Sequence, residues 1–383
     1  MTNEIEIGRG KRATQAYSLD DVAIVPNRRT RDPKDVSVSW QIDAFQLETP
    51  ILGAPMDSVM SPATAIQLGR LGGLGVLNLE GLWTRYENPQ AILDEIAGLR
   101  SESERRSDPK ITAKLQKLYG APIQPELITS RISEIREAGV VVAGSLTPQR
   151  TQEHYQTVID AGVDIFVIRG TTVSAEHVSK TTEPLNLKQF IYELDVPVIV
   201  GGAAGYTPAM HLMRTGAAGV LVGFGGGATS TTRRTFGIHS PMASAISDVA
   251  AARRDYLEES GGRYVHVIAD GGVGSSGDIV KSLAMGADAV MLGAALARAE
   301  EAPGQGWHWG IEAAHETSPR GDRVPVGTVA PLEELLFGPS HETTGSSNLV
   351  GALRRAMATT GYSTLKEFQR VDVVVSPYEA DRF

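Results

Sequence analysis

A strand–helix–strand unit occurs twice in the second half of this chain, and the repeat restricts the folds that are open to it. In the first copy, an apolar run leads to Gly201-Gly202, a helical stretch follows, and a second apolar run ends at Gly223. The second copy has its glycines 70 residues later, at Gly271-Gly272 and Gly293. Short, nearly continuous apolar runs are typical of parallel strands that are buried on both faces. The repeat therefore predicts parallel βαβ units.

The same pattern extends over most of the chain. Gly216 and Gly286 precede the second strand of each copy, where we expect them to end the helix in the left-handed conformation. The predicted strands cover residues 50–54, 74–78, 139–144, 164–168, 197–200, 219–222, 265–268 and 289–292. Eight strands with amphipathic stretches such as 62–71 and 276–285 between them predict an α/β fold, a (β/α)8 TIM barrel. A doubly wound open sheet is the alternative.

The domain organisation follows from the length and from two irregular regions. The chain has 383 residues, which fits one large barrel, and we predict a single domain over 1–383. Residues 88–139 are polar and helical and form a predicted insertion after the second strand. Residues 304–345 are irregular and form a predicted flap-like region, and an amphipathic helix is expected at 349–357.

Composition excludes several classes of protein. The net charge is −9, and no Lys- or Arg-rich run is present, so we expect no nucleic-acid partner. The absence of cysteine excludes disulfides, thiolate metal sites and a cysteine nucleophile. No apolar run approaches the roughly 20 residues of a membrane-spanning helix, and residues 1–12 lack the apolar core of a secretion signal. We therefore expect a cytoplasmic protein without a membrane partner.

Glycine-rich segments follow several predicted strands, at the end of the barrel where active sites lie. They are residues 53–59, 223–233, 269–277 and 293–295. Such loops bring backbone N–H groups close to an anion, and the loops after strands seven and eight are the usual phosphate site of this fold. Asp270 stands just before Gly271-Gly272, where a carboxylate suits ribose hydroxyls. The pattern predicts a nucleotide or sugar phosphate as the ligand.

At these residues the chain resembles the IMP dehydrogenase and GMP reductase family over nearly its whole length. The matching motifs lie in one order along the chain, at residues 17–26, 54–59, 71–76, 225–233, 268–273, 276–279, 286–293 and 350–355. Residues 6–10 and 313–321 are most similar to a bacterial IMP-dehydrogenase-related paralogue. That branch lacks the regulatory CBS domains, and the insertion at 88–139 occupies their place.

The resemblance implies an oxidoreductase of guanine nucleotide biosynthesis that converts IMP, NAD and water to XMP and NADH. It also implies a homotetramer. The resemblance implies that Met56 lies against the purine ring, that Ser58 lies near the nucleotide, and that Asp270 binds the ribose hydroxyls. Backbone groups around Gly271, Gly272, Gly293 and Ala294 would hold the 5′-phosphate.

Cofactor and ion contacts are also implied by the resemblance. The dinucleotide NAD would lie near Arg169, Gly170, Gly202, Gly223 and Gly225. A potassium ion would be held by the backbone carbonyls of Gly225, Gly227 and Ser230. The covering segment, residues 304–321, would close over the site, and Arg320 and Thr232 would join Ser230 in catalysis.

Two departures from the family pattern bear on activity. The family has a nucleophilic cysteine where this chain has Ser230. A thiol with a pKa of about 8.5 supplies thiolate near neutral pH, whereas a serine hydroxyl needs an adjacent base. Arg169 and Gly202 replace an aspartate and an asparagine on the dinucleotide side.

Three functions therefore remain open. The first is an IMP-dehydrogenase-type oxidoreductase. The second is a catalytically impaired, purine-nucleotide-binding regulatory paralogue. The third is GMP reductase, which Arg234 supports weakly because reductases often carry a basic residue there.

Overall fold

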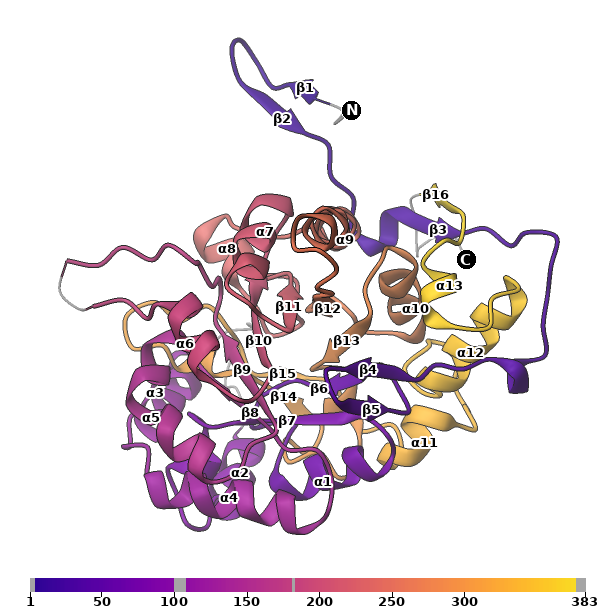
Figure 1. Ribbon diagram of the computed structural model, residues 1–383. Helices are drawn as coiled ribbons and strands as arrows, with labels where there is room; N and C mark the ends of the chain where they lie inside the picture. The colour runs from indigo at the N-terminus through magenta and orange to yellow at the C-terminus, as the bar shows by residue number, and fades with distance from the viewer. Residues whose placement is uncertain (1–3, 100–107, 181–182, 377–383) are drawn as a thin grey trace.

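A closed barrel of eight parallel strands forms the centre of the computed structural model, which describes residues 4–99, 108–180 and 183–376 (Figure 1). Neighbouring strands pair in the order β10-β11-β12-β13-β6-β7-β8-β9, and β9 pairs with β10 to close the ring. The strands are β6 (Ile51–Gly53), β7 (Leu74–Asn78), β8 (Ala143–Leu146), β9 (Ile165–Arg169), β10 (Val198–Ala203), β11 (Gly219–Val222), β12 (His266–Asp270) and β13 (Ala289–Leu292). The barrel is confirmed, and the open sheet is excluded.

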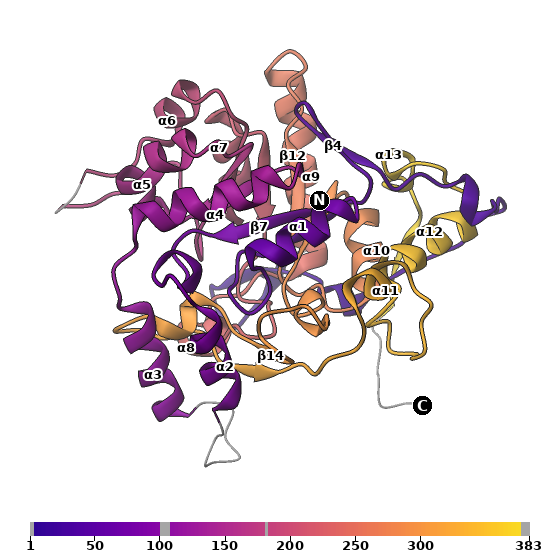
Figure 2. The same ribbon diagram turned by 90° about the horizontal axis from the view of Figure 1, so that it is seen from below.

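A helix follows each barrel strand and packs on the outside of the ring (Figures 1 and 2). These helices are α1 (Pro62–Arg70), α4 (Pro125–Glu137), α5 (Pro148–Asp160), α6 (Leu187–Glu193), α7 (Tyr206–Arg214), α9 (Met242–Glu259), α10 (Ser276–Ala284) and α12 (Leu349–Thr359). Gly216 and Gly286 have φ values of 100° and 113° just after α7 and α10, as their positions before a strand predict.

The predicted strand at 139–144 was placed too early. Gly139 has φ of 73° and lies beyond the end of α4, so it belongs to the helix-to-strand turn. Val140 and Val141 are only partly buried, and β8 begins at Ala143. A run of three valines after a glycine has the composition of a strand, but all three valines precede β8 and connect the helix to the sheet.

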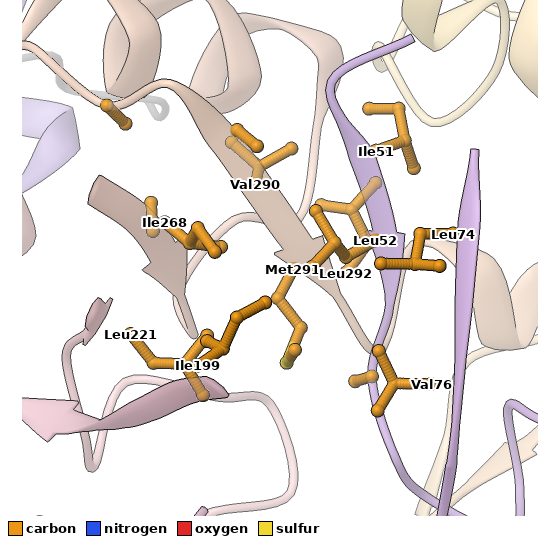
Figure 3. Packing of buried hydrophobic residues seen from close by; sticks show 14 of the residues in the cluster. Ile51, Leu52, Leu74, Val76, Ile199, Leu221, Ile268, Val290, Met291 and Leu292 are labelled. Atoms are coloured by element: carbon orange, nitrogen blue, oxygen red, sulfur yellow. The ribbon is translucent and has the colours of Figure 1, made fainter. Parts of the chain in front are cut away.

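Large aliphatic side chains fill the barrel and the layer between the strands and the helices. Figure 3 shows Ile199, Leu221 and Ile268 from three successive strands pointing toward one another near Met291. Each of these side chains is at most 1% exposed. Burial of one such side chain is worth about 1.5–3 kcal/mol, so this core holds the strand ends in fixed positions.

Several short elements lie outside the barrel. Two helices of the 88–139 region, α2 (Gln90–Gly98) and α3 (Pro109–Tyr119), stand away from the ring, whereas α4 packs between α1 and α5 (Figure 2). The remaining helices are α8 (Thr232–Phe236), α11 (Leu332–Phe337) and α13 (Leu365–Phe368). Within the described ranges, every helix is too short or too polar to cross a lipid bilayer.

Four antiparallel two-stranded sheets complete the fold. They are β1 (Glu4–Glu6) with β2 (Arg12–Thr14), β3 (Val22–Ile24) with β16 (Val373–Val375), β4 (Trp40–Ile42) with β5 (Phe45–Leu47), and β14 (Trp307–His308) with β15 (Val324–Pro325). The β1–β2 hairpin projects from the body of the molecule (Figure 1). The β14–β15 pair carries the covering segment, which contains the 3-10 helix η5 (Ile311–Ala314).

A second hydrophobic cluster joins the covering segment to α2 and α3. Trp309 and Ala313 of the covering segment contribute to it, and both are almost fully buried. The other buried members are Leu82, Leu93, Ile96, Leu115, Leu118 and Tyr119. This second cluster therefore anchors the covering segment on the insertion helices.

Candidate functional site

A cavity of about 300 Å³ opens at the carboxyl ends of the barrel strands, within the size range of ligand sites. Met291 of β13 lines it from the barrel core. The predicted site residues that line it are Met56, Arg169, Gly170, Gly223, Gly225, Gly227, Ser230, Thr232, Asp270, Gly271, Gly272, Gly293, Ala294 and Arg320. The structure thus brings together most of the residues that the sequence singled out.

Ser58 does not line this cavity. It is fully buried, and its Oγ lies 3.0 Å from Nδ1 of His308. The Ser58 hydroxyl also donates to the carbonyl of Trp309 at 2.9 Å and accepts the N–H of Trp309 at 3.1 Å. Ser58 therefore positions the strand β14 and its neighbour, and His308 stands between Ser58 and the cavity.

Gly202 also lies outside the cavity lining, packed against the end of the neighbouring strand. A Cβ atom at this position would overlap the carbonyl oxygen of Gly223. The close approach of the β10 and β11 ends excludes any side chain here. The glycine is therefore required by packing between the two strand ends.

The Asp270 carboxylate is occupied by Arg169. Arg169 Nε lies 2.8 Å from Oδ2 of Asp270, and its Nη2 lies 3.4 Å from Oδ1. Nη1 of Arg169 lies 3.7 Å from Oε1 of Glu312, a residue of η5. Burial alone would lower the pKa of Arg169, but the two carboxylates raise it above its usual value. The guanidinium therefore remains charged and links β9, β12 and the covering segment.

Ser230 points its hydroxyl at a neighbouring threonine. Ser230 Oγ lies 3.2 Å from Oγ1 of Thr232 and accepts the Thr232 N–H at 3.3 Å. Among the described residues, no His, Lys or carboxylate group makes a hydrogen bond with Ser230. The site therefore supplies no base in contact with this hydroxyl, and the hydroxyl remains a poor nucleophile.

The covering segment lies across the cavity and is tied to both of its sides. Ser230 forms an isolated antiparallel bridge with Gly321, and the Thr231 N–H donates to the carbonyl of Arg320 at 2.8 Å. The side chain of Arg320 donates through Nε to Oγ1 of Thr171 at 2.8 Å. Arg320 therefore faces the cavity beside the loop that follows β9.

Backbone N–H groups at the other end of the cavity come from the loops after β12 and β13. Asp278, in the first turn of α10, accepts hydrogen bonds from the N–H groups of Gly274 and Ser275 at 3.1 Å. These two N–H groups are thus already paired. Gly271 and Gly272 line the cavity before that turn and Gly293 lines it after β13, so these glycines form the end that suits an anion.

A second cavity of about 470 Å³ adjoins the first. Arg169, Gly170, Thr171, Glu312 and Arg320 line both cavities. The second cavity is also lined by polar side chains that include Asn78, Glu80, Arg85, Ser145 and Arg150. The two cavities together offer room for two ligand moieties on either side of Arg169.

Of the titratable residues that line the cavity, the sequence interpretation missed three. They are Asp278, His308 and Glu312. Ser275 and Asp278 have the spacing of a capping box, which could have predicted the helix start but not a place in the cavity. Nothing in the local sequence of His308 or Glu312 marks them, because a long loop carries them back to the barrel. Across the described residues, no three His, Asp or Glu side chains gather as metal ligands.

These features define a (β/α)8-barrel protein with a polar, glycine-lined ligand cavity at the carboxyl ends of its strands. The chain belongs to the IMP dehydrogenase / GMP reductase family of oxidoreductases, because the family model for the IMP dehydrogenase / GMP reductase domain matches residues 16–314.

Similar proteins agree with this assignment. A crystal structure of an IMP dehydrogenase/GMP reductase-like protein from Corynebacterium glutamicum has a TM-score of 0.92 and 47% sequence identity, and the match covers 98% of each chain. An uncharacterized oxidoreductase of Mycolicibacterium smegmatis is 51% identical over 375 residues, covering 97% of this chain and 99% of that protein. Inosine-5′-monophosphate dehydrogenase of Methanocaldococcus jannaschii is 27% identical, covering 76% of this chain and 74% of that enzyme.

Proposed function

We propose that this protein binds a purine nucleoside monophosphate in the first cavity and acts as an IMP-dehydrogenase-type oxidoreductase. The reaction is the oxidation of IMP with NAD and water to XMP and NADH. The observation that carries the proposal is the convergence of Met56, Asp270, the Gly271-Gly272 loop and Gly293 on one cavity. These groups come from three different strand ends, and each suits one part of a nucleotide.

Each part of IMP has a counterpart in this proposal. The thioether of Met56 is apolar and polarizable and packs against the purine ring. Asp270 accepts the ribose hydroxyls once Arg169 shares or releases its carboxylate. The backbone N–H groups near Gly271, Gly272, Gly293 and Ala294 bind the 5′-phosphate. Arg320 lies over the opposite end of the cavity, where it orients the water that attacks the base.

The second cavity is the proposed place of the cofactor. NAD supplies the acceptor for the hydride when it is bound. The cavity has room for part of a dinucleotide, and Arg85 and Arg150 offer cationic groups for its phosphates. Arg169 and Gly170 form the boundary between the two ligands, and Gly223 and Gly225 line the first cavity only.

A potassium site is proposed in the loop that follows β11. Gly225, Gly227 and Ser230 lie close together there, and the Gly227 carbonyl accepts the Ser230 N–H at 3.0 Å. An ion in this loop would be held by backbone carbonyls alone, which suits a monovalent cation. The melting temperature should be higher in KCl than in equimolar NaCl, and equal values in the two salts would argue against this site.

Two measurements test the proposed function. IMP or XMP should raise the melting temperature, because a ligand that binds only the folded state stabilises it by mass action. Asp270→Ala should remove most of that shift by deleting the ribose hydrogen bonds. NADH formation from IMP and NAD, followed by absorbance, tests the reaction. The absence of any shift with IMP, XMP or GMP at millimolar concentration would falsify the proposal.

The Ser230 hydroxyl favours a second candidate function, a purine-nucleotide-binding regulatory protein without catalytic activity. Its only side-chain partner among the described residues is Thr232, which is no base. A nucleotide-dependent thermal shift without NADH formation would select this candidate. NADPH-dependent formation of IMP from GMP would instead identify a GMP reductase.

We also propose that the protein is a cytoplasmic homotetramer. The resemblance to the family supports this assembly, and the projecting β1–β2 hairpin leaves Ile5 and Ile7 about half exposed. Light scattering coupled to size-exclusion chromatography measures the mass directly. Monomers of 40.8 kDa at micromolar concentration would contradict the assembly.

A further inference from the structure

His308 is a buried histidine whose ring reaches the anion-binding end of the first cavity. It lies on β14, it is 2% exposed, and it lines the cavity. A Cβ atom on Gly293 would lie 3.1 Å from Nε2 of His308, so that nitrogen borders the loop after β13. In the part of the chain that the structure describes, Nδ1 is hydrogen-bonded and Nε2 has no hydrogen-bond partner.

The contacts of Ser58 favour the tautomer of His308 that carries its hydrogen on Nδ1. Ser58 has one hydroxyl hydrogen, which the carbonyl of Trp309 accepts at 2.9 Å. Since that hydrogen is used, the 3.0 Å contact between Ser58 Oγ and His308 is satisfied when Nδ1 carries the hydrogen and donates it. A neutral His308 then presents a bare lone pair at Nε2 to the cavity.

Among the described residues, no charged side chain forms a hydrogen bond or ion pair with the His308 ring. Its neighbours are Ser58 and Met56 from the loop after β6, Gly293 after β13, and Trp309. Burial alone lowers the pKa of His308 to about 4, so the ring is neutral near pH 7. The charged side chains that line the same cavity are Arg169, Asp270, Asp278, Glu312 and Arg320.

A phosphoryl group at this end of the cavity favours the protonated form of His308. Its oxygens carry close to two negative charges at pH 7 and only accept hydrogen bonds, so they repel the Nε2 lone pair. Adding a proton to Nε2 turns the repulsion into a charge-assisted hydrogen bond, which is among the stronger polar contacts in proteins. The His308 ring is almost fully buried, so water screens this attraction only weakly.

We infer that His308 is the side-chain ligand of the phosphoryl group and that the group binds together with a proton, which His308 takes from solvent. This inference rests on the proposed nucleotide site. It adds that affinity for a phosphorylated ligand depends on pH through one residue, whereas affinity for the unphosphorylated nucleoside does not. The backbone N–H groups of the glycine loops supply the remaining contacts, and these do not titrate.

Calorimetric titration at pH 7.5 in two buffers of different ionisation enthalpy measures the proton uptake. Binding of IMP to the native protein should take up about one proton, and affinity should fall by up to about tenfold per pH unit between pH 7 and 8.5. His308→Gln keeps a donor near the position of Nε2 but does not titrate. This variant should bind IMP without proton uptake and with little pH dependence.

Controls separate this inference from the proposed function. His154→Gln alters another buried histidine, on α5 and outside the first cavity, and should leave the proton uptake unchanged. Inosine lacks the phosphate and inorganic phosphate lacks the nucleoside, so only the second should show proton uptake. IMP binding to native protein with no proton uptake, or equal uptake in His308→Gln, overturns the role of His308. Uptake with phosphate but no IMP binding overturns only the nucleotide proposal.

Discussion

Arg169 and Asp270 neutralise each other across the mouth of the barrel, and they lie 101 residues apart in the sequence. The Asp270 side chain is 8% exposed and that of Arg169 is 22% exposed, so water screens the pair only partly. A ligand that uses the Asp270 carboxylate must compete with a charged hydrogen bond worth about 1.5–3 kcal/mol. The ion pair therefore sets the affinity for any ribose at this position.

Arg169→Ala should tighten the binding of IMP by about tenfold, because the ribose hydroxyls no longer compete with the guanidinium. The same change should lower the free energy of unfolding by about 1–3 kcal/mol, since Asp270 loses its partner. Calorimetry and urea denaturation measure the two effects. Arg214→Ala is the control, because its ion pair with Glu259 is about half exposed and should contribute little to the free energy of unfolding. Weaker IMP binding in Arg169→Ala would show that Arg169 holds the nucleotide.

Ser230→Cys should raise the rate of NADH formation, because a thiol ionises near neutral pH and a serine hydroxyl does not. We expect the native protein to turn over at least about a thousandfold more slowly than a cysteine-containing relative, a loss of about 4 kcal/mol of transition-state stabilisation. Recovery should be partial, since Arg169 still occupies the cofactor side. A steady-state assay with IMP and NAD measures both proteins. Native turnover of several per second would refute this thiol argument.

Sequence motifs predicted most of the residues that line the cavity, but not the hydrogen bonds and ion pairs between their side chains. The glycine loops and Asp270 follow predicted strands, so the barrel geometry brings them together. The partners of Asp270 and Ser58 could not be predicted, because Arg169, Glu312 and His308 reach them from distant loops. Side-chain pairing across a barrel mouth depends on loop conformation, which local patterns do not encode.

At the scale of elements, Asp288 joins two strands to two helices. It precedes β13, and its Oδ2 lies 2.6 Å from Nη1 of Arg253 on α9 and accepts the N–H of Val267 on β12 at 2.9 Å. The Tyr264 hydroxyl donates to Oδ1 at 2.7 Å, and Lys366 of α13 contacts the same oxygen. Burial would raise the pKa of Asp288, but Arg253 and Lys366 lower it to about 2.

Asp288→Asn should destabilise the fold by about 3–5 kcal/mol, because it leaves the buried Arg253 without its carboxylate. Chemical denaturation at pH 7 measures this loss. The stabilisation by Asp288 is present above its unfolded pKa of about 3.8 and is lost as the pH falls through about 2. The two proteins should therefore converge in stability in acid. Glu259→Gln, which breaks an exposed pair, is the matched control, and an equal loss in both variants would contradict the prediction.

The elements themselves were predicted well where one physical signal dominated. The strands at 74–78, 219–222 and 289–292 have the bounds of β7, β11 and β13, because glycine or polar residues border a short apolar run. The start of β8 was predicted too early, because the valines before it are residues typical of a strand. Sequence patterns thus determine which elements exist more firmly than where they begin.

For the whole molecule, buried titratable groups act on acid stability in opposite directions. Burial lowers the pKa of His266 and of His308 to about 4, so the fold loses stability as the pH falls from about 6.5 toward 4. Burial raises the pKa of Asp57 to about 6, although the hydrogen bond from Tyr119 opposes this shift. The stabilisation of the fold by the protonated Asp57 is fully present below pH 3.8 and is lost as the pH rises through about 6.

In Asp57→Asn, the free energy of unfolding should fall more steeply as the pH is lowered. Of the three groups, Asp57 is the one that stabilises the fold at low pH, and the substitution removes it. Between pH 4 and 6, these groups together should take up about one proton on unfolding in the native protein and about two in the variant. Melting temperatures measured from pH 4.5 to 7 give the slopes. An unchanged slope in Asp57→Asn would mean that Asp57 is already ionised in the folded protein.

The second hydrophobic cluster has a consequence for how the molecule opens. Trp309, Tyr119 and Leu118 pack together apart from the barrel core, and Trp309 Nε1 donates to the Tyr119 hydroxyl at 3.0 Å. Segments that share a separate core open and close together as one cooperative unit. The amide hydrogens of α2, α3 and the covering segment should therefore exchange with solvent at a common rate, faster than those of the barrel strands. Access to the cavity would then be governed by the local unfolding of this unit rather than by the motion of a free loop.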